Sequence, residues 1–164
     1  VPGSYEFGLL QAQRARTASL FACNEYAVYS NKSLQLVDGL WTNVVDVSLQ
    51  CDYGGEFGTA LNNDIFLAVW RQVVKDGRFA HHDWTVKCDA DAVFMPDRLR
   101  TLLTGREEGP RGVYLANCKM GLHGPLEVLS TKAVKTWHSG IPHCVKHFRA
   151  LCSGDCFWGE DMFL

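Results

Sequence analysis

The sequence predicts an α/β fold, a layered sheet covered by helices, on three observations. Helix-like and strand-like stretches alternate along the chain. The length of 164 residues suits one domain, and 47% hydrophobic with 21% charged residues is enough to bury a core. We therefore expect residues 1–164 to form a single domain. Because the chain begins without Met and stops in mid-pattern at Leu164, we also expect it to be cut from a longer protein at both ends.

The N-terminal part is expected to begin with a helix and to continue in short strands. Ser4 can cap a helix that runs to about Arg16. Asp38-Gly39 is a turn signal. Three short runs have the apolar and aromatic composition of strands, and they are Leu20–Cys23, Tyr26–Tyr29 and Trp41–Val47.

The rest of the chain is expected to alternate helices with strands. Helical spacing of Phe66, Val69, Trp70 and Val73 predicts a helix, which Asp76-Gly77 ends. Two more helices are expected, one at Pro96–Leu102 with Gly105 just after it, and one from Ser130 or Thr131 to about Gly140. The expected strands are Trp84–Lys87, Val113–Ala116 and Leu126–Leu129.

Composition excludes some functions and indicates a compartment. The formal net charge of −2 argues against a nucleic-acid binder, which needs surplus Lys and Arg to contact phosphates. No apolar run approaches the roughly 18–20 residues that span a bilayer. Seven cysteines are many for a cytosolic chain of this size. We therefore expect disulfides, with at least one thiol left over, and a place in the secretory pathway. The glycosylation sequon at Asn31 agrees with that place.

Two acidic residues after a predicted strand carry the clearest chemical signal. Asp89 and Asp91 follow Trp84–Lys87, and alternate residues of an extended segment point the same way. Adjacent carboxylates repel unless a cation lies between them. Mg²⁺ or Mn²⁺ commonly binds one or two carboxylates together with the phosphates of a substrate. The pattern therefore predicts a divalent-metal site for a phosphorylated ligand. A turn in which one Asp caps the following segment is the alternative.

Two later segments also carry candidate site residues. Glu160 and Asp161 are adjacent acids just after Trp158, and they suit a general base beside a sugar-stacking side chain. The same acids also suit the first turn of a helix. Gly124 lies in a turn before a predicted strand, where bare backbone either admits a ligand or only forms the turn.

Together these residues resemble the nucleotide-sugar glycosyltransferases of the GT-A fold, in particular the β-1,3-galactosyltransferase, N-acetylglucosaminyltransferase and fringe-like group. Residues 87–94 are similar to that group's Lys-x-Asp-x-Asp-x-x-Phe block. Gly124–Ser130 is similar to its Gly…Tyr-x-Leu-Ser segment, and Glu160-Asp161-Met162 to its Glu-Asp-Val motif. The likeness covers Asn62–Leu164 and implies a Rossmann-like mixed sheet flanked by helices.

The resemblance implies a metal-dependent inverting transferase that moves a sugar from a UDP-sugar to a hydroxyl of a glycan or glycoprotein. Asp91 would bind Mn²⁺ (or Mg²⁺), and Asp89 would contact the ribose and assist the metal. Asp161 would be the general base, while Glu160 and Trp158 would position the acceptor. The resemblance also implies a substrate contact at Gly124 and a place in the Golgi lumen, with a membrane anchor outside these residues.

A haloacid-dehalogenase-like phosphatase is the first alternative. Residues 89–93 also fit the Asp-x-Asp-x-Val/Thr block of those enzymes, in which Asp89 would be the covalent nucleophile. Ser130 or Thr131 after a strand, Lys132 or Lys135, and Glu160-Asp161 would imitate the remaining motifs of that class.

A non-catalytic interaction domain is the second alternative. His143 and His147, followed by Cys152 and Cys156, have the ligand types and spacing of a zinc site. Paired cysteines account for the same region without a metal.

Overall fold

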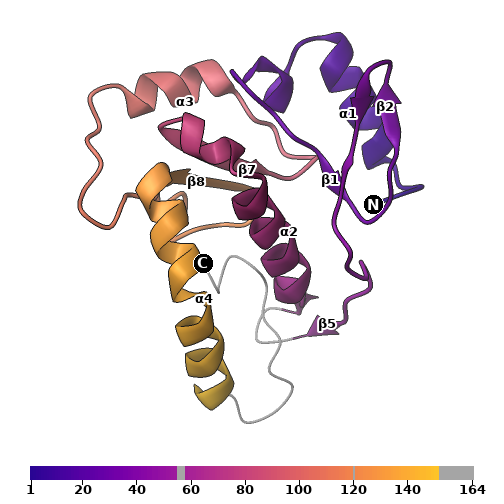
Figure 1. The fold of residues 1–164 in the computed structure, drawn as a ribbon. Helices are drawn as coiled ribbons and strands as arrows, with labels where there is room; N and C mark the ends of the chain where they lie inside the picture. Colours follow the sequence, from indigo (N-terminus) through magenta and orange to yellow (C-terminus); the bar gives the residue numbers. More distant parts are fainter. Residues whose placement is uncertain (55–57, 120, 152–164) are drawn as a thin grey trace. The chain divides into compact units, whose positions relative to one another are not determined.

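The computed structural model describes residues 1–54, 58–119 and 121–151 (Figure 1). The chain divides into two compact units. Unit 1 comprises Val1–Ser48 and Cys88–Glu107, and unit 2 comprises Leu49–Lys87 and Glu108–Leu164. Helices and short strands follow one another along the described residues, so the predicted α/β class is confirmed at that level. That the two units form one catalytic domain stays a prediction.

Unit 1 begins with helix α1 (Glu6–Ala15), which lies within the helix predicted from the sequence. Ser4 does not cap it, so that prediction is wrong. The N-cap position is Tyr5, and the Ser4 hydroxyl group donates instead to the carbonyl oxygen of Val1 at 2.7 Å. The hydroxyl is thereby used in the turn that precedes the helix. Glu6 places an acidic side chain in the first turn of α1, where it favours the positive end of the helix dipole.

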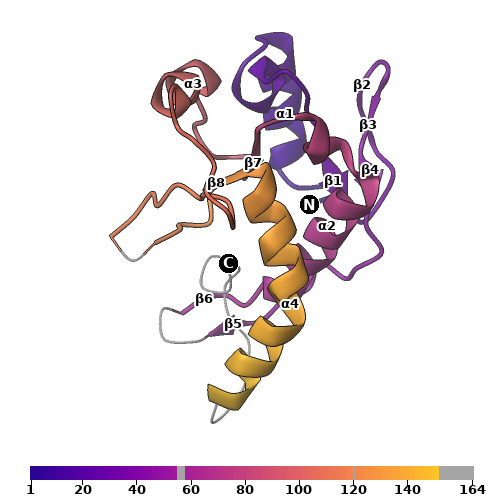
Figure 2. The same ribbon diagram turned by 60° about the vertical axis from the view of Figure 1, so that its left-hand side comes forward.

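The strands of unit 1 are short, and each pairs with one other strand. They are β1 (Tyr29–Ser30), β2 (Gln35–Val37), β3 (Leu40–Trp41) and β4 (Asn43–Val44). β1 and β4 are parallel, whereas β2 and β3 form an antiparallel hairpin about Asp38-Gly39 (Figure 2). Trp41–Val47 is therefore not one strand. Thr42 separates β3 from β4, because its buried hydroxyl accepts the amide of Leu34 and donates to the carbonyl oxygen of Lys32.

The core of unit 1 is built on Leu10, Phe21 and Leu36. Phe21 belongs to the 3-10 helix η1 (Ser19–Ala22), where the sequence predicted a strand. The 3-10 helix buries Ser19 and Phe21. Helix α3 (Pro96–Leu103) begins at Pro96, as predicted, and ends before a glycine with positive φ, Gly105.

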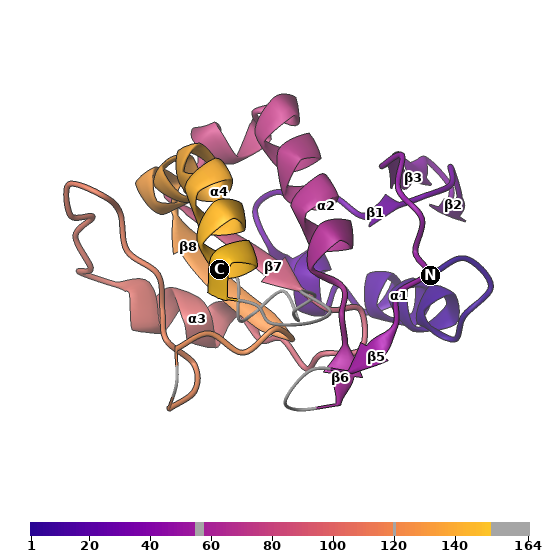
Figure 3. The same ribbon diagram turned by 90° about the horizontal axis from the view of Figure 1, so that it is seen from below.

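Unit 2 is organised around two helices and one strand. Helix α2 (Asn63–Asp76) and helix α4 (Thr131–Leu151) lie side by side (Figures 1 and 3). They pack with strand β8 (Leu126–Ser130) through a core cluster of Trp70, Phe79, Leu129, Ala133 and Val134. α2 ends at Gly77, whose φ of +71° confirms the predicted stop. A second small sheet pairs β5 (Tyr53–Gly54) with β6 (Thr59–Ala60), and the 3-10 helix η2 (Arg78–His81) follows α2.

β8 is paired on both edges. One neighbour is β7 (Trp84–Cys88), and the amide of Thr131, just after β8, donates to the carbonyl oxygen of Asp83, just before β7. The other neighbour is the segment around Tyr114, which forms an isolated bridge to Leu129 in place of the full strand predicted at Val113–Ala116. Residues 127–130 are buried, and the Glu127 side chain is wholly inside.

Helix α4 is longer than predicted. It continues beyond Gly140 and Pro142 over 21 residues, so the expected end near Gly140 is wrong. Gly140 does not have the positive φ of a C-terminal cap. The continuing helix buries Ile141 against Leu67 of α2, and this contact offsets the backbone hydrogen bond that Pro142 removes. None of the described helices has the length and the apolar run needed to cross a membrane.

Candidate functional site

Asp89 and Asp91 lie in a turn at the end of β7. The strand ends at Cys88, and the amide of Ala92 donates to the carbonyl oxygen of Asp89 at 3.1 Å. The sequence predicted an extended backbone for this segment, and that prediction is therefore wrong. Ala90, between the two acids, packs against the core of unit 1, while Asp89 is half-buried and Asp91 is exposed.

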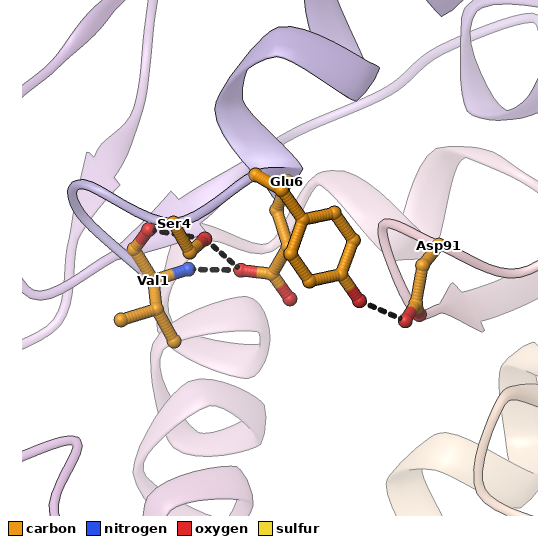
Figure 4. A network of polar contacts seen from close by, with 5 residues as sticks. Val1, Ser4, Glu6 and Asp91 are labelled. Atoms are coloured by element: carbon orange, nitrogen blue, oxygen red, sulfur yellow. Dashed lines mark hydrogen bonds and ion pairs between the residues drawn. The ribbon is translucent and has the colours of Figure 1, made fainter.

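Helix α1 holds this turn at two points. The Tyr5 hydroxyl donates to Oδ2 of Asp91 at 2.5 Å, and Figure 4 shows the contact on the Asp91 carboxylate. The side-chain amide of Gln13 donates to the carbonyl oxygen of Ala90 at 2.9 Å. Both contacts lie within unit 1. The helix therefore fixes both the backbone between the two acids and the carboxylate of the second.

The charge of Asp91 affects its partner. The hydrogen bond to Asp91 and the charge of that carboxylate raise the pKa of Tyr5 above its ordinary value. Tyr5 therefore keeps its proton at neutral pH and remains a hydrogen-bond donor. A carboxylate offers about four lone-pair positions. One hydrogen bond from Tyr5 leaves Asp91 with oxygen positions that suit a hard divalent cation.

The acids available in the described part of the chain limit the kind of metal site. No group of three or more His, Cys, Asp or Glu side chains there is arranged to hold a metal ion. An ion bound here would therefore take one or two carboxylates, from Asp89 and Asp91, and its other ligands from elsewhere. This donor set fits Mg²⁺ or Mn²⁺, which usually keep waters and take substrate phosphates as ligands.

Gly124 lies in unit 2, in the turn that precedes β8. The ammonium group of Lys87 donates to its carbonyl oxygen at 2.6 Å and lies 4.2 Å from the centre of the Phe66 ring. Lys87 therefore fixes the backbone at Gly124. Asp89 and Asp91, in contrast, belong to unit 1.

Three predicted site residues, Trp158, Glu160 and Asp161, lie outside the described residues. Their roles as acceptor contacts and general base stay predictions.

The hydroxyl groups that the phosphatase interpretation needs have structural contacts. Oγ of Ser130 accepts the amide of Val113 at 2.9 Å and that of Ala133 at 3.3 Å, so Ser130, one of the two residues predicted for this place, caps α4. The Thr131 hydroxyl donates to the carbonyl oxygen of His82. Both hydroxyls therefore connect elements of unit 2, which counts against their use in holding a phosphate.

A carboxylate also lies at the N-terminus of α4. Glu108 accepts the amide of Lys132 and forms an ion pair with its ammonium group at 3.5 Å. Desolvation alone would raise the pKa of Glu108. The hydrogen bonds from Lys132 and Ser130 and the charge of Lys132 outweigh it, so the pKa lies below its ordinary value. The positive end of the helix dipole therefore already has an anionic partner within the chain.

The candidate zinc ligands are described only in part. His143 and His147 are exposed on α4, with ring centres 6.3 Å apart and planes 7° from parallel. Cys152 and Cys156 lie outside the described residues.

No disulfide joins any two of the described cysteines, which are Cys23, Cys51, Cys88, Cys118 and Cys144. Burial raises the pKa of the Cys23 thiol, against the opposite effect of the nearby Arg100 guanidinium. The predicted disulfides stay a prediction.

The sequence did not indicate Tyr5 and Gln13 as site residues. They contact residues 86 and 77 positions later in the chain, and neither belongs to a local motif. Comparison of the chain with family models, curated proteins and solved structures finds no match. The candidate site is therefore defined by the geometry of its own residues.

Proposed function

We propose that the chain is the catalytic part of a metal-dependent inverting glycosyltransferase of the GT-A kind. It would transfer a sugar from a UDP-sugar to a hydroxyl group of a glycan or glycoprotein. The observation that carries the proposal is the turn at Asp89 and Asp91, in which an exposed carboxylate is held at a fixed place by the hydroxyl of Tyr5. Such a site fits a nucleotide diphosphate bound through a divalent ion.

The residues of the chain then have separate tasks. Asp91 would hold Mn²⁺ or Mg²⁺, whose charge neutralises the departing diphosphate. Asp89 would contact the ribose and assist in holding the ion. Asp161 would accept the proton of the acceptor hydroxyl while that oxygen attacks the anomeric carbon. The bond to the diphosphate breaks as the new bond forms on the opposite face, which inverts the configuration.

The two-carboxylate donor set has a consequence for binding. Asp89 and Asp91 would hold the ion, and because the described residues offer it no larger group of ligands, the phosphates of the nucleotide would supply others. The metal and the nucleotide should therefore bind together, each raising the affinity of the protein for the other.

The proposal includes a place in the Golgi lumen. The seven cysteines and the sequon at Asn31 support an oxidising compartment of the secretory pathway. The anchor of such a protein would lie outside residues 1–164.

Titration calorimetry with UDP, with and without Mn²⁺, tests the proposal. We expect binding with Mn²⁺ and a large loss of affinity without it. Asp91→Asn should abolish the metal-dependent part, because it removes a charged ligand. Asp46→Asn is the matched control, since Asp46 is also exposed and belongs to unit 1. Equal affinity of the wild-type chain for UDP in both conditions would count against the assignment.

A second measurement addresses the general base. Asp161→Ala should leave UDP binding intact and stop the release of UDP from a panel of UDP-sugars supplied with acceptor glycans. Loss of UDP binding in this variant would remove the proposed role of Asp161.

The two alternatives make different predictions. A phosphatase would form a phosphoenzyme on Asp89 when given an aryl phosphate, and we expect none, because Ser130, Thr131 and Lys132 have structural contacts. A zinc-bound interaction domain would contain stoichiometric zinc after purification, and metal analysis of the chain decides this.

A further inference from the structure

The contact between Tyr5 and Asp91 has a role beyond the fold. We propose that Tyr5 is a positioning residue, which orients the carboxylate of Asp91 for its metal ion. This inference rests on the proposed function and adds a residue to its machinery.

Burial does not explain the position of the Tyr5 side chain, since it is 69% exposed. The hydroxyl is nevertheless 2.5 Å from Oδ2 of Asp91, a length typical of a hydrogen bond to a charged acceptor. Such bonds are stronger than those between neutral groups. The bond therefore restricts the rotation of an exposed carboxylate that would otherwise sample several rotamers.

Helix α1 makes this contact rigid. Tyr5 is the N-cap residue of α1, and Leu10 of the same helix is buried in the core of unit 1. Gln13, in the last turn of the helix, donates to the carbonyl oxygen of Ala90. The Asp89–Ala92 turn is thus attached to one packed helix through both its backbone and its second carboxylate.

The physical reason for such an attachment lies in metal binding. Carboxylates that bind metals are usually held by hydrogen bonds from an outer set of residues, and the loss of one such partner typically costs about 10- to 100-fold in metal affinity. The hydroxyl of Tyr5 is this kind of partner for Asp91, because it binds one oxygen and leaves other lone pairs for the ion.

The test compares Tyr5→Phe with Tyr53→Phe. Tyr53 is 80% exposed in unit 2, so its variant removes the same atom from a comparable surface. Mn²⁺ affinity is measured by electron paramagnetic resonance of the free ion at saturating UDP, and the melting temperature of each variant is measured by circular dichroism. We expect Tyr5→Phe to weaken Mn²⁺ binding about 10-fold with an unchanged melting temperature. Tyr53→Phe should match the wild type in both.

Each other outcome overturns the inference. Unchanged Mn²⁺ affinity in Tyr5→Phe, with or without a lower melting temperature, leaves Tyr5 a structural role only. Tighter Mn²⁺ binding would show that the hydroxyl competes with the ion. In both cases the wild type and Tyr53→Phe still bind Mn²⁺ with UDP, so the proposed function stands. Failure of the wild type itself to bind Mn²⁺ with UDP would overturn the proposed function, and the positioning role with it.

Discussion

The Ser130→Ala variant tests how unit 2 is held together. Oγ of Ser130 accepts two amides, that of Ala133 in the first turn of α4 and that of Val113 in the neighbouring segment. Only 1% of the residue is exposed, so water does not replace the hydroxyl when it is removed. The substitution therefore leaves two backbone donors without their acceptor, one in a helix cap and one at the edge of β8.

The cost follows from these two contacts. Replacing a helix N-cap serine with alanine typically costs about 1 kcal/mol. A buried donor left without a partner costs about 1–3 kcal/mol, and the half-buried position of Val113 favours the lower part of that range. The free energy of unfolding should fall by about 2–3 kcal/mol. With a urea dependence of about 2 kcal/mol per molar, the midpoint of unfolding falls by roughly 1–1.5 M.

Urea unfolding, followed by tryptophan fluorescence, provides the assay. Ser139→Ala is the matched control, because exposed Ser139 lies on the same helix and its hydroxyl donates only to the carbonyl oxygen of Thr136. That variant should stay within about 0.5 kcal/mol of the wild type. If Ser130→Ala also stayed within that limit, the assignment of Ser130 as the cap of α4 would be refuted.

Three further variants concern stability. Glu108→Gln should lower the free energy of unfolding at pH 7 and lower it much less at pH 3. The pKa of Glu108 in the folded protein lies below its ordinary value of 4.5, so the charged carboxylate stabilises the fold above pH 4.5. This stabilisation is lost as the pH falls through the pKa of the folded state. An equal effect at both pH values in urea unfolding would contradict this account. Gly140→Ala should raise the free energy of unfolding by about 0.5–1 kcal/mol, since the residue is helical and an added Cβ meets open space. Gly77→Ala should instead lower the free energy of unfolding, since φ is +71° at Gly77. A loss of stability in both variants would show that Gly140 is not an ordinary helical residue.

Much of unit 2 could be predicted because its signals are local. The spacing of apolar residues predicted α2, and Gly77 marked its end, since only glycine adopts that backbone without strain. Ser130 as the cap of α4 follows equally from neighbouring residues. The end of α4 was missed because the contact of Ile141 with Leu67 joins two helices, and no local pattern contains it.

Unit 1 was harder to predict for the same reason. The run Leu20–Cys23 has the composition of a strand, yet a 3-10 helix there buries Phe21 against Leu10 and Leu36. Thr42 interrupts the run at Trp41–Val47 through hydrogen bonds to residues eight and ten positions away. In both places a contact with a distant residue outweighs the propensity of a few residues.

The amino-acid sequence by itself determined that two acids follow a short apolar strand. The prediction of a metal site rests on those two acids. It also determined the α/β class, since periodicity, caps and turns act within a few residues. Only the tertiary structure decided that Asp89 and Asp91 lie in a turn and that Tyr5 and Gln13 hold it. Such hydrogen bonds join residues far apart in the chain, and they form only once a packed core has brought α1 and the end of β7 together.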